Sequence, residues 1–87
     1  MRVGPYDYQV LYEKPHSAGA VGETDADHLT IRIDPDLPKE RQRVILWHEG
    51  LHAIIECLSI NIKGEEDLVD RLAPALVEFV DRNRRML

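Results

Sequence analysis

Apolar and polar residues alternate in two stretches of the first third of the chain, residues 6–12 and 28–33, and this is the period of a β-strand. The segment between them, residues 15–27, is rich in proline, glycine and acidic residues. It predicts a loop, with a short strand near residues 20–23. The side chains that share one side are Tyr6, Tyr8, Val10 and Tyr12 in the first stretch and Leu29, Ile31 and Ile33 in the second.

A first helix is predicted after the second strand. Residues 34–38 contain two prolines and two aspartates, which end the strand. Asp36 is placed to cap a helix that is expected from about Pro38 to Leu58. Gly50 falls in the middle of this helix, where glycine costs on the order of 1 kcal/mol relative to alanine. Close packing of its backbone against the sheet or the second helix is expected to offset that cost.

A second helix is expected after a break at residues 59–64. It opens with three acidic residues, which suit the positive end of the helix dipole, and it continues from Glu65 to about Arg85. Pro74 lies inside this helix, so a kink is expected there, and the carbonyl of Asp70 loses its usual N–H partner.

These elements predict a single domain over residues 1–87, of the α+β class. With 87 residues, the chain can bury only a small core. The expected arrangement is a small antiparallel β-sheet packed on two helices.

Composition and charge narrow the function classes. Apolar residues make up 44% and charged residues 31%, the balance of an ordinary soluble domain. The formal net charge of −5 argues against nucleic acid as a direct partner. Cys57 is the only cysteine, which excludes an internal disulfide and fits a reducing compartment. No apolar run approaches the roughly 18 residues that span a bilayer, so we expect a cytoplasmic protein with no membrane partner.

The first predicted helix carries the pattern HExxH, formed by His48, Glu49 and His52. Residues four apart on a helix differ by about 40° in direction and about 6 Å in rise, so both imidazoles project from one face and can bind one ion. Zinc accepts imidazole nitrogen and, with an open position, holds and acidifies a water molecule. Glu49 is roughly 100° around the helix, where its carboxylate can act as general base.

A structural interpretation competes with this one. Both histidines could be hydrogen-bonded core residues. The two histidines at this spacing, with Glu49 between them, favour the metal site. The apolar residues that share their side of the helix are Val44, Ile45, Leu51 and Ile55.

A hydrolytic zinc site needs a third protein ligand. Glu56 lies on the same helix, but it stands about 12 Å along the axis from His48, too far for one straight helix to bring all three ligands to one ion. A ligand from the second helix is therefore expected. The acidic residues available downstream of the motif are Glu56, Glu65, Glu66, Asp67, Asp70 and Glu78.

The run from His48-Glu49-x-x-His52 to Glu66-x-x-x-Asp70 resembles the gluzincin arrangement. In that arrangement the first acid of the next helix is the third zinc ligand, and the later aspartate orients a ligand histidine. The resemblance therefore implies Glu66 as the third metal ligand and Asp70 as the hydrogen-bond partner of a histidine, a contact that would fix the imidazole tautomer.

A broader stretch, from about Gly22 to Asn83, is similar to the small phage and prophage members of the ImmA/IrrE-like zinc metallopeptidases. The similarity rests on residues 31–43, on HExxH and on the acidic start of the second helix. It implies a minimal zincin-like domain that binds Zn²⁺ and cleaves a protein or peptide inside a bacterial cell, such as a phage or prophage repressor. The link from His52 to Glu66 is shorter than in larger members, Asp70 stands where they often have asparagine, and Pro74 interrupts the helix. Glu65 and Asp70 therefore remain alternative third ligands.

Other polar side chains have less specific signals. Trp47 and Cys57 are expected to pack as apolar residues. A donor for the developing oxyanion is expected among residues that no spacing singles out. These candidates are Tyr6, Tyr8, Tyr12, His16 and His28.

Two function hypotheses follow. The first is a zinc metallopeptidase. The second is a binding or regulatory module in which zinc is structural or the site is inactive, and function lies in protein contacts. With so few residues to wall a cleft, a homodimer or a partner could complete either form.

Overall fold

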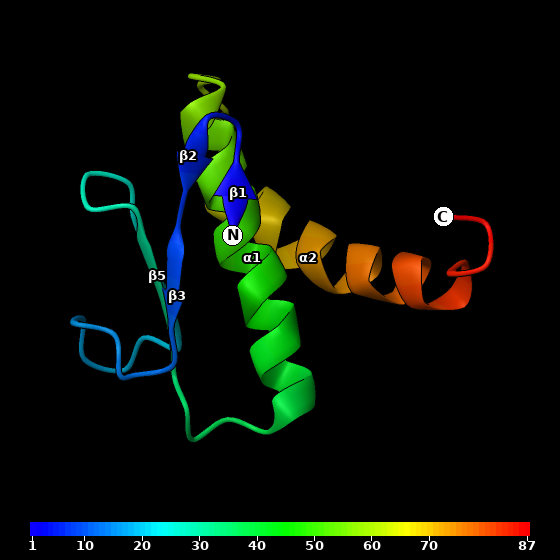
Figure 1. The fold of residues 1–87 in the computed structure, drawn as a ribbon, viewed down its shortest axis with the longest axis horizontal. Coiled ribbons are helices and arrows are strands. Elements are labelled where there is room, and N and C mark those ends of the chain that lie inside the picture. Colours follow the sequence, from blue (N-terminus) through cyan, green and yellow to red (C-terminus); the bar gives the residue numbers. More distant parts are fainter.

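The computed structural model describes all of residues 1–87 and confirms an α+β fold, with five short strands followed by two helices. In Figure 1 the strands lie beside one face of the first helix, and the second helix extends away from the sheet. The elements are β1 (Arg2–Val3), β2 (Tyr6–Asp7), β3 (Gln9–Leu11), β4 (Gly22–Asp25), β5 (Thr30–Ile33), α1 (Lys39–Cys57) and α2 (Glu65–Arg82).

The main sheet is mixed, so the expected antiparallel sheet is wrong in one of its two pairings. Its strand order is β3-β5-β4, in which β4 and β5 pair antiparallel and β3 and β5 pair parallel. The connection between β3 and β4 carries the chain past the position of β5, and the tight turn after β4 then returns β5 to the middle. Alternation along the sequence identifies strands but not the direction of their neighbours.

The expected strand at residues 6–12 divides into two. β2 pairs antiparallel with β1, whereas β3 joins the main sheet. Tyr8 lies between them and is 3% exposed, so the break turns this side chain into the core.

The core forms where α1 covers the sheet. Ile31 and Ile33 of β5 are fully buried, which confirms that they share one side of the strand, and that side faces the core. Ile45 and Ala53 of α1 pack in the same cluster, together with Val3 from the N-terminal hairpin. Only this small cluster holds the sheet on α1, as expected for a chain of this length.

α1 begins one residue later than expected, and the predicted cap is wrong. Pro38 precedes the first turn and no side chain caps it. The backbone N–H of Asp36 donates instead to the carboxylate of Asp34, at 2.9 Å. The side-chain amide of Gln42 donates to two carbonyls of the preceding loop, at 3.0 and 3.1 Å. The loop is thus held by hydrogen bonds from within the helix rather than by a cap.

α2 follows a left-handed residue, Gly64, whose φ is 74°. It ends at Arg82, a few residues before the expected boundary, and it is continuous through Pro74. One backbone hydrogen bond is lost because proline has no N–H, but the helix does not end there. Neither helix combines the length and apolarity that crossing a membrane would need.

Gly50 packs under the N-terminus rather than against the sheet or α2. A β-carbon at this position would meet the side chain of Met1, 3.7 Å away, and nothing closer. The N-terminal hairpin folds over α1 at this point. The sequence prediction for Gly50 named only the sheet and the second helix as packing partners and did not include this contact. Trp47 and Cys57 are both half-buried, and the thiol of Cys57 lies 3.9 Å from the carbonyl of Val3.

An ion pair fastens the far end of α2 to the start of α1. The guanidinium of Arg43 donates to both carboxylate oxygens of Asp81, at 2.7 and 2.6 Å. Arg43, together with Arg84, holds the pKa of Asp81 at about 2, below its ordinary value of 3.8. Because two hydrogen bonds join the same two groups, the relative orientation of this pair is more tightly fixed than that of an ordinary surface ion pair.

Acid is therefore expected to weaken the docking of α2. Because the pKa of Asp81 is lower in the folded chain, the pair stabilises the fold above the ordinary pKa, and that contribution is lost as the pH falls toward about 2. Asp81→Asn should lower the thermal unfolding midpoint at neutral pH and flatten its fall between about pH 4 and pH 2, measured by circular dichroism. Asp67→Asn, at an exposed carboxylate of the same helix, is the control. An unchanged acid dependence in Asp81→Asn would contradict this role.

Candidate metal centre

The helix pair brings the HExxH motif against the start of α2. His48 and His52 are one turn apart on α1, with side chains 12% and 17% exposed. The link to α2 reverses the chain through two left-handed residues, Ser59 with a φ of 55° and Gly64 with a φ of 74°. This short reversal places the first turn of α2 beside His52.

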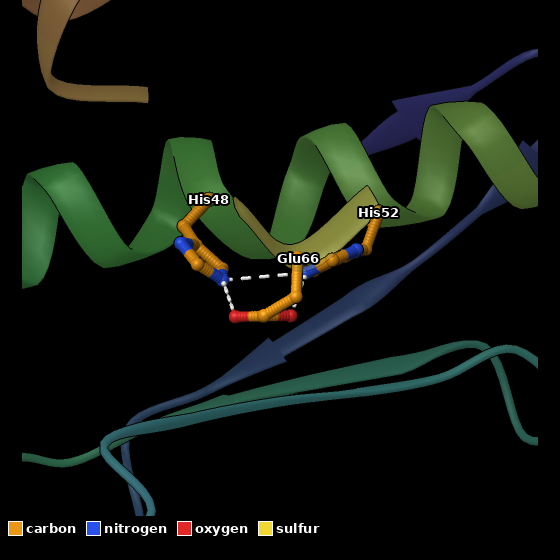
Figure 2. A group of neighbouring side chains, drawn as sticks. All are labelled: His48, His52 and Glu66. Carbon is orange, nitrogen blue, oxygen red and sulfur yellow. Dashed lines mark hydrogen bonds and ion pairs between the residues drawn. The ribbon is translucent and has the colours of Figure 1, made fainter. Parts of the chain in front are cut away.

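Three side chains converge at this point: His48, His52 and Glu66 (Figure 2). The Nε2 atoms of the two histidines are 3.2 Å apart. One carboxylate oxygen of Glu66 lies 3.0 Å from Nε2 of His48, and the other lies 2.9 Å from Nε2 of His52. This is the one group of His, Cys, Asp or Glu residues in the chain that could hold a metal ion.

The spacing of these donor atoms suits a small tetrahedral ion. Nitrogen and oxygen ligands about 2.0–2.1 Å from such an ion are about 3.3–3.4 Å from one another. The two Nε2 atoms are 3.2 Å apart, close to that value, and one donor atom from each of the three residues lies within 4.8 Å of the others. The group can therefore close around one ion.

Carboxylates lie behind both rings. Nδ1 of His52 is 2.6 Å from Glu65, and Nδ1 of His48 is 3.4 Å from Asp70. An ionised carboxylate only accepts hydrogen bonds, so each ring faces an acceptor at both nitrogens, with Glu66 at Nε2 and Glu65 or Asp70 at Nδ1. A cation bound between the Nε2 atoms and Glu66 would leave the Nδ1 proton of each ring to the outer carboxylate, which fixes the tautomer that metal binding needs.

The surrounding charge acts on the pKa of His52. Burial by itself lowers this pKa, but the hydrogen bond to Glu65 and the nearby charges of Glu66 and Glu49 outweigh it and raise the pKa above its ordinary value. The field at the site therefore favours positive charge on or beside the rings. A divalent cation at Nε2 satisfies that field.

Glu49 stands beside the three donors without joining them. Its residue is 7% exposed, and its Oε2 atom is 3.9 Å from Nε2 of His48. The hydroxyl of Thr24, on β4, lies 2.7 Å from the other oxygen of Glu49 and 3.1 Å from its backbone carbonyl. A β-carbon at Gly22 would come within 2.7 Å of Oε2, so the strand needs glycine there to admit the carboxylate.

Two hollows flank the group. One, of about 310 Å³, runs along α1 toward Glu56 and Glu65, and the other, of about 380 Å³, runs toward Arg41. Glu49 and Glu66 line both, so the hollows meet at the candidate metal centre. Both hollows lie between β4 and the two helices, so an extended ligand can approach the candidate metal centre from either side.

None of the five oxyanion candidates lines either hollow. Tyr8 is buried in the core, and Tyr6 lines a different cavity. His16 and His28 are exposed and pair with acidic residues of β4, while Tyr12 is exposed and borders no cavity of this group. Arg41 is the one lysine or arginine that lines either hollow.

The structure brings together the residues expected from the motif and adds others. His48, His52, Glu49, Glu66 and Asp70 lie within one cluster. Glu65, considered above as a substitute ligand, contacts the outer nitrogen of His52 instead. The residues that sequence reasoning missed are Gly22, Thr24 and Arg41.

Each missed residue had a weak signal. Gly22 and Thr24 are two apart on a short strand and so share a face. Arg41 is seven residues before His48, which is two helical turns along the same side of α1. These spacings place residues on faces but do not say what each face meets.

The metal-binding group makes a quantitative prediction. The purified chain should bind one zinc ion, and His52→Ala or Glu66→Gln should weaken binding by more than about 100-fold, because each removes a direct ligand. Asp70→Asn should weaken it by about 10- to 100-fold, since it removes only the support of a ligand. Elemental analysis and calorimetric titration measure both effects.

Glu56→Gln is the matched control, because this acid lines the same hollow without touching the three donors. Equal loss of zinc from Glu56→Gln and Glu66→Gln would mean that binding reflects general negative charge.

A scan of protein-family models and searches of the curated proteins and of the solved structures give no match to this chain. Its function therefore has to be inferred from the geometry of the metal-binding group itself.

Proposed function

We propose that this protein is a zinc-dependent peptidase that hydrolyses a peptide bond with Glu49 as the general base. The observation that carries the proposal is the position of one buried carboxylate, that of Glu49, 3.9 Å from a nitrogen of the three-donor group and outside that group. A carboxylate placed there is near the metal but is left free to move a proton.

Zinc is proposed because of the donor set. Two imidazole nitrogens and one carboxylate are the ligands of many hydrolytic zinc sites, and the set leaves the fourth position to solvent or substrate. Zinc bound there would act as a Lewis acid that acidifies a water molecule and polarises a carbonyl group. The protein residues supply everything else.

Glu49 would take a proton at Oε2, the oxygen that faces His48, and pass it to the departing amine. Thr24 would hold the other oxygen. A hydroxyl group has one proton, so Thr24 can donate either to the ionised carboxylate or to the backbone carbonyl of Glu49. When Glu49 carries the proton on Oε2, its Oε1 atom still accepts from the Thr24 hydroxyl, so the same contact serves both states.

The substrate proposed is an extended segment of a protein. β4 is an edge strand of the main sheet and carries Thr24 beside Glu49. Edge strands bind extended peptides through their free backbone groups. Arg41, at the end of the second hollow, offers positive charge to a substrate carboxylate or to a developing oxyanion. The resemblance to the ImmA/IrrE-like peptidases suggests an intracellular protein, such as a phage repressor, as the natural target.

The number of protein ligands favours this proposal over a structural zinc. Structural sites are usually closed by four protein ligands, whereas catalytic sites keep an open position. The group here offers three donors, and the hollows on both sides lead to it.

Glu49→Gln is the direct test of the general base. The variant should bind zinc as the unaltered chain does and lose about 10²- to 10⁴-fold in turnover, because the amide cannot accept the proton. Cleavage is measured by mass spectrometry on a mixture of random-sequence peptides. Glu56→Gln, at an acid that lines the same hollow without touching the three donors, should keep full activity. Unchanged turnover in Glu49→Gln would rule out the proposed base.

Thr24 gives a second test. Thr24→Val keeps the shape of the side chain and removes the hydroxyl that holds Glu49, so turnover should fall by on the order of 10- to 100-fold through loss of orientation. The affinity for zinc, measured by calorimetry, should stay the same because Thr24 touches no ligand. Thr24→Ser restores the hydroxyl and should recover most of the turnover. Failure of serine to rescue would point to packing instead.

A further inference from the structure

α2 exposes a row of apolar side chains that has no partner within the chain. The members of the row are Leu68, Leu72, Ala75 and Phe79, with the three larger ones 43%, 37% and 56% exposed. The side of α2 that packs inside the domain carries Val69 and Ala73, both fully buried. The row is therefore a second apolar face, distinct from the face that α2 turns toward α1.

The spacing of the row is that of a helix–helix seam. Its members follow one another at intervals of four, three and four residues. On a helix these positions fall within about 60° of one another and form one narrow stripe, the pattern of the core positions of a coiled coil. Pro74 lies well outside the stripe, so it does not prevent a second helix from approaching.

We propose that this row is the interface with a second copy of the chain, formed by two antiparallel α2 helices related by a two-fold axis. The intervals read the same in both directions, so the row is complementary to itself when reversed. Leu68 then faces Phe79 of the second copy, and Leu72 faces Ala75. Each large side chain in the middle meets a small one, which lets the helices approach closely.

The charged residues that flank the row agree with the same register. Arg71 and Glu78 lie just outside it, on the same edge, and both are exposed. In an antiparallel pair of helices these equivalent edge positions lie opposite each other, so Arg71 of one copy meets Glu78 of the other. The two-fold axis repeats this pair of opposite charges.

The surface area of the chain supports a partner of this size. The chain exposes 6184 Å². A folded monomer of the same mass, 10.0 kDa, exposes about 5,200 Å², which leaves an excess of about 1,000 Å². A standard interface buries about 800 Å² on each partner. The radius of gyration, 13.0 Å against about 12 Å for a compact chain of this length, agrees with a helix that projects from the domain.

The dimer does not rest on the proposed zinc chemistry. Glu66 points roughly 150° away from the row around α2, so the metal-binding group stays clear of the interface. Zinc binding and dimer formation can therefore be measured separately.

Sedimentation equilibrium of the 87-residue chain is the first test. The expected mass is about 20 kDa, twice the chain mass of 10.0 kDa. Leu72→Lys places a charge in the middle of the seam and should raise the dissociation constant at least about 100-fold, as a buried unpaired charge is costly. Leu58→Lys is the matched control, because Leu58 is a more exposed leucine (61%) outside the row and should leave the dimer intact. Circular dichroism of both variants checks that the fold is kept.

The antiparallel register has its own test. Arg71→Glu alone places two glutamates opposite each other, and Glu78→Arg alone places two arginines opposite each other, so each variant should dimerise weakly. A mixture of the two variants restores both pairs of opposite charge and should form a heterodimer about as tight as the unaltered dimer. Native mass spectrometry, with one variant isotope-labelled, separates heterodimers from homodimers.

Three outcomes would overturn the proposal. A chain that stays monomeric at all attainable concentrations has no such interface, and the row then serves another occupant. A dimer that survives Leu72→Lys, or that dissociates with Leu58→Lys, forms through a different surface. Failure of the two charge variants to associate when mixed would exclude the antiparallel register.

Discussion

Carboxylates at the start of α2 hold the imidazole rings of α1, and the rest of the molecule is arranged around this contact. Glu65 and Asp70 approach the outer nitrogens of the rings, while Glu66 faces the inner ones. The two inner nitrogens lie 3.2 Å apart and share the carboxylate of Glu66. Two helices of one small chain can keep such a group together because a shared cation would compensate the charge.

The small core makes this contact important for stability as well. Few apolar residues hold the sheet on α1, and α2 adds only a short buried face. α2 is therefore held largely by polar contacts at its two ends, with the carboxylate–imidazole group at the start and the Arg43–Asp81 pair near the finish. Small domains often depend on a metal for stability, and a zinc ion here would join the two helices directly.

β4 links the sheet to the proposed chemistry. Thr24 and Gly22 lie on the face of this strand that meets Glu49. Thr24 donates a hydrogen bond to the carboxylate, and Gly22 has no side chain that would collide with it. The proposed base is therefore oriented by the sheet and not by its own helix. The opposite side of α2 remains free, so one helix can serve the metal site on one face and a second copy of the chain on another.

Local periodicity determined much of this site in advance. A spacing of four on a helix is enough to place His48 and His52 on one side, and alternation is enough to find the buried face of β5. Only the tertiary structure decided that Glu66 meets both rings, that β3 runs parallel to β5, and that Gly50 lies under Met1. These features depend on how the loops return the chain, and loop paths are set by contacts between residues far apart in sequence, which periodicity does not encode.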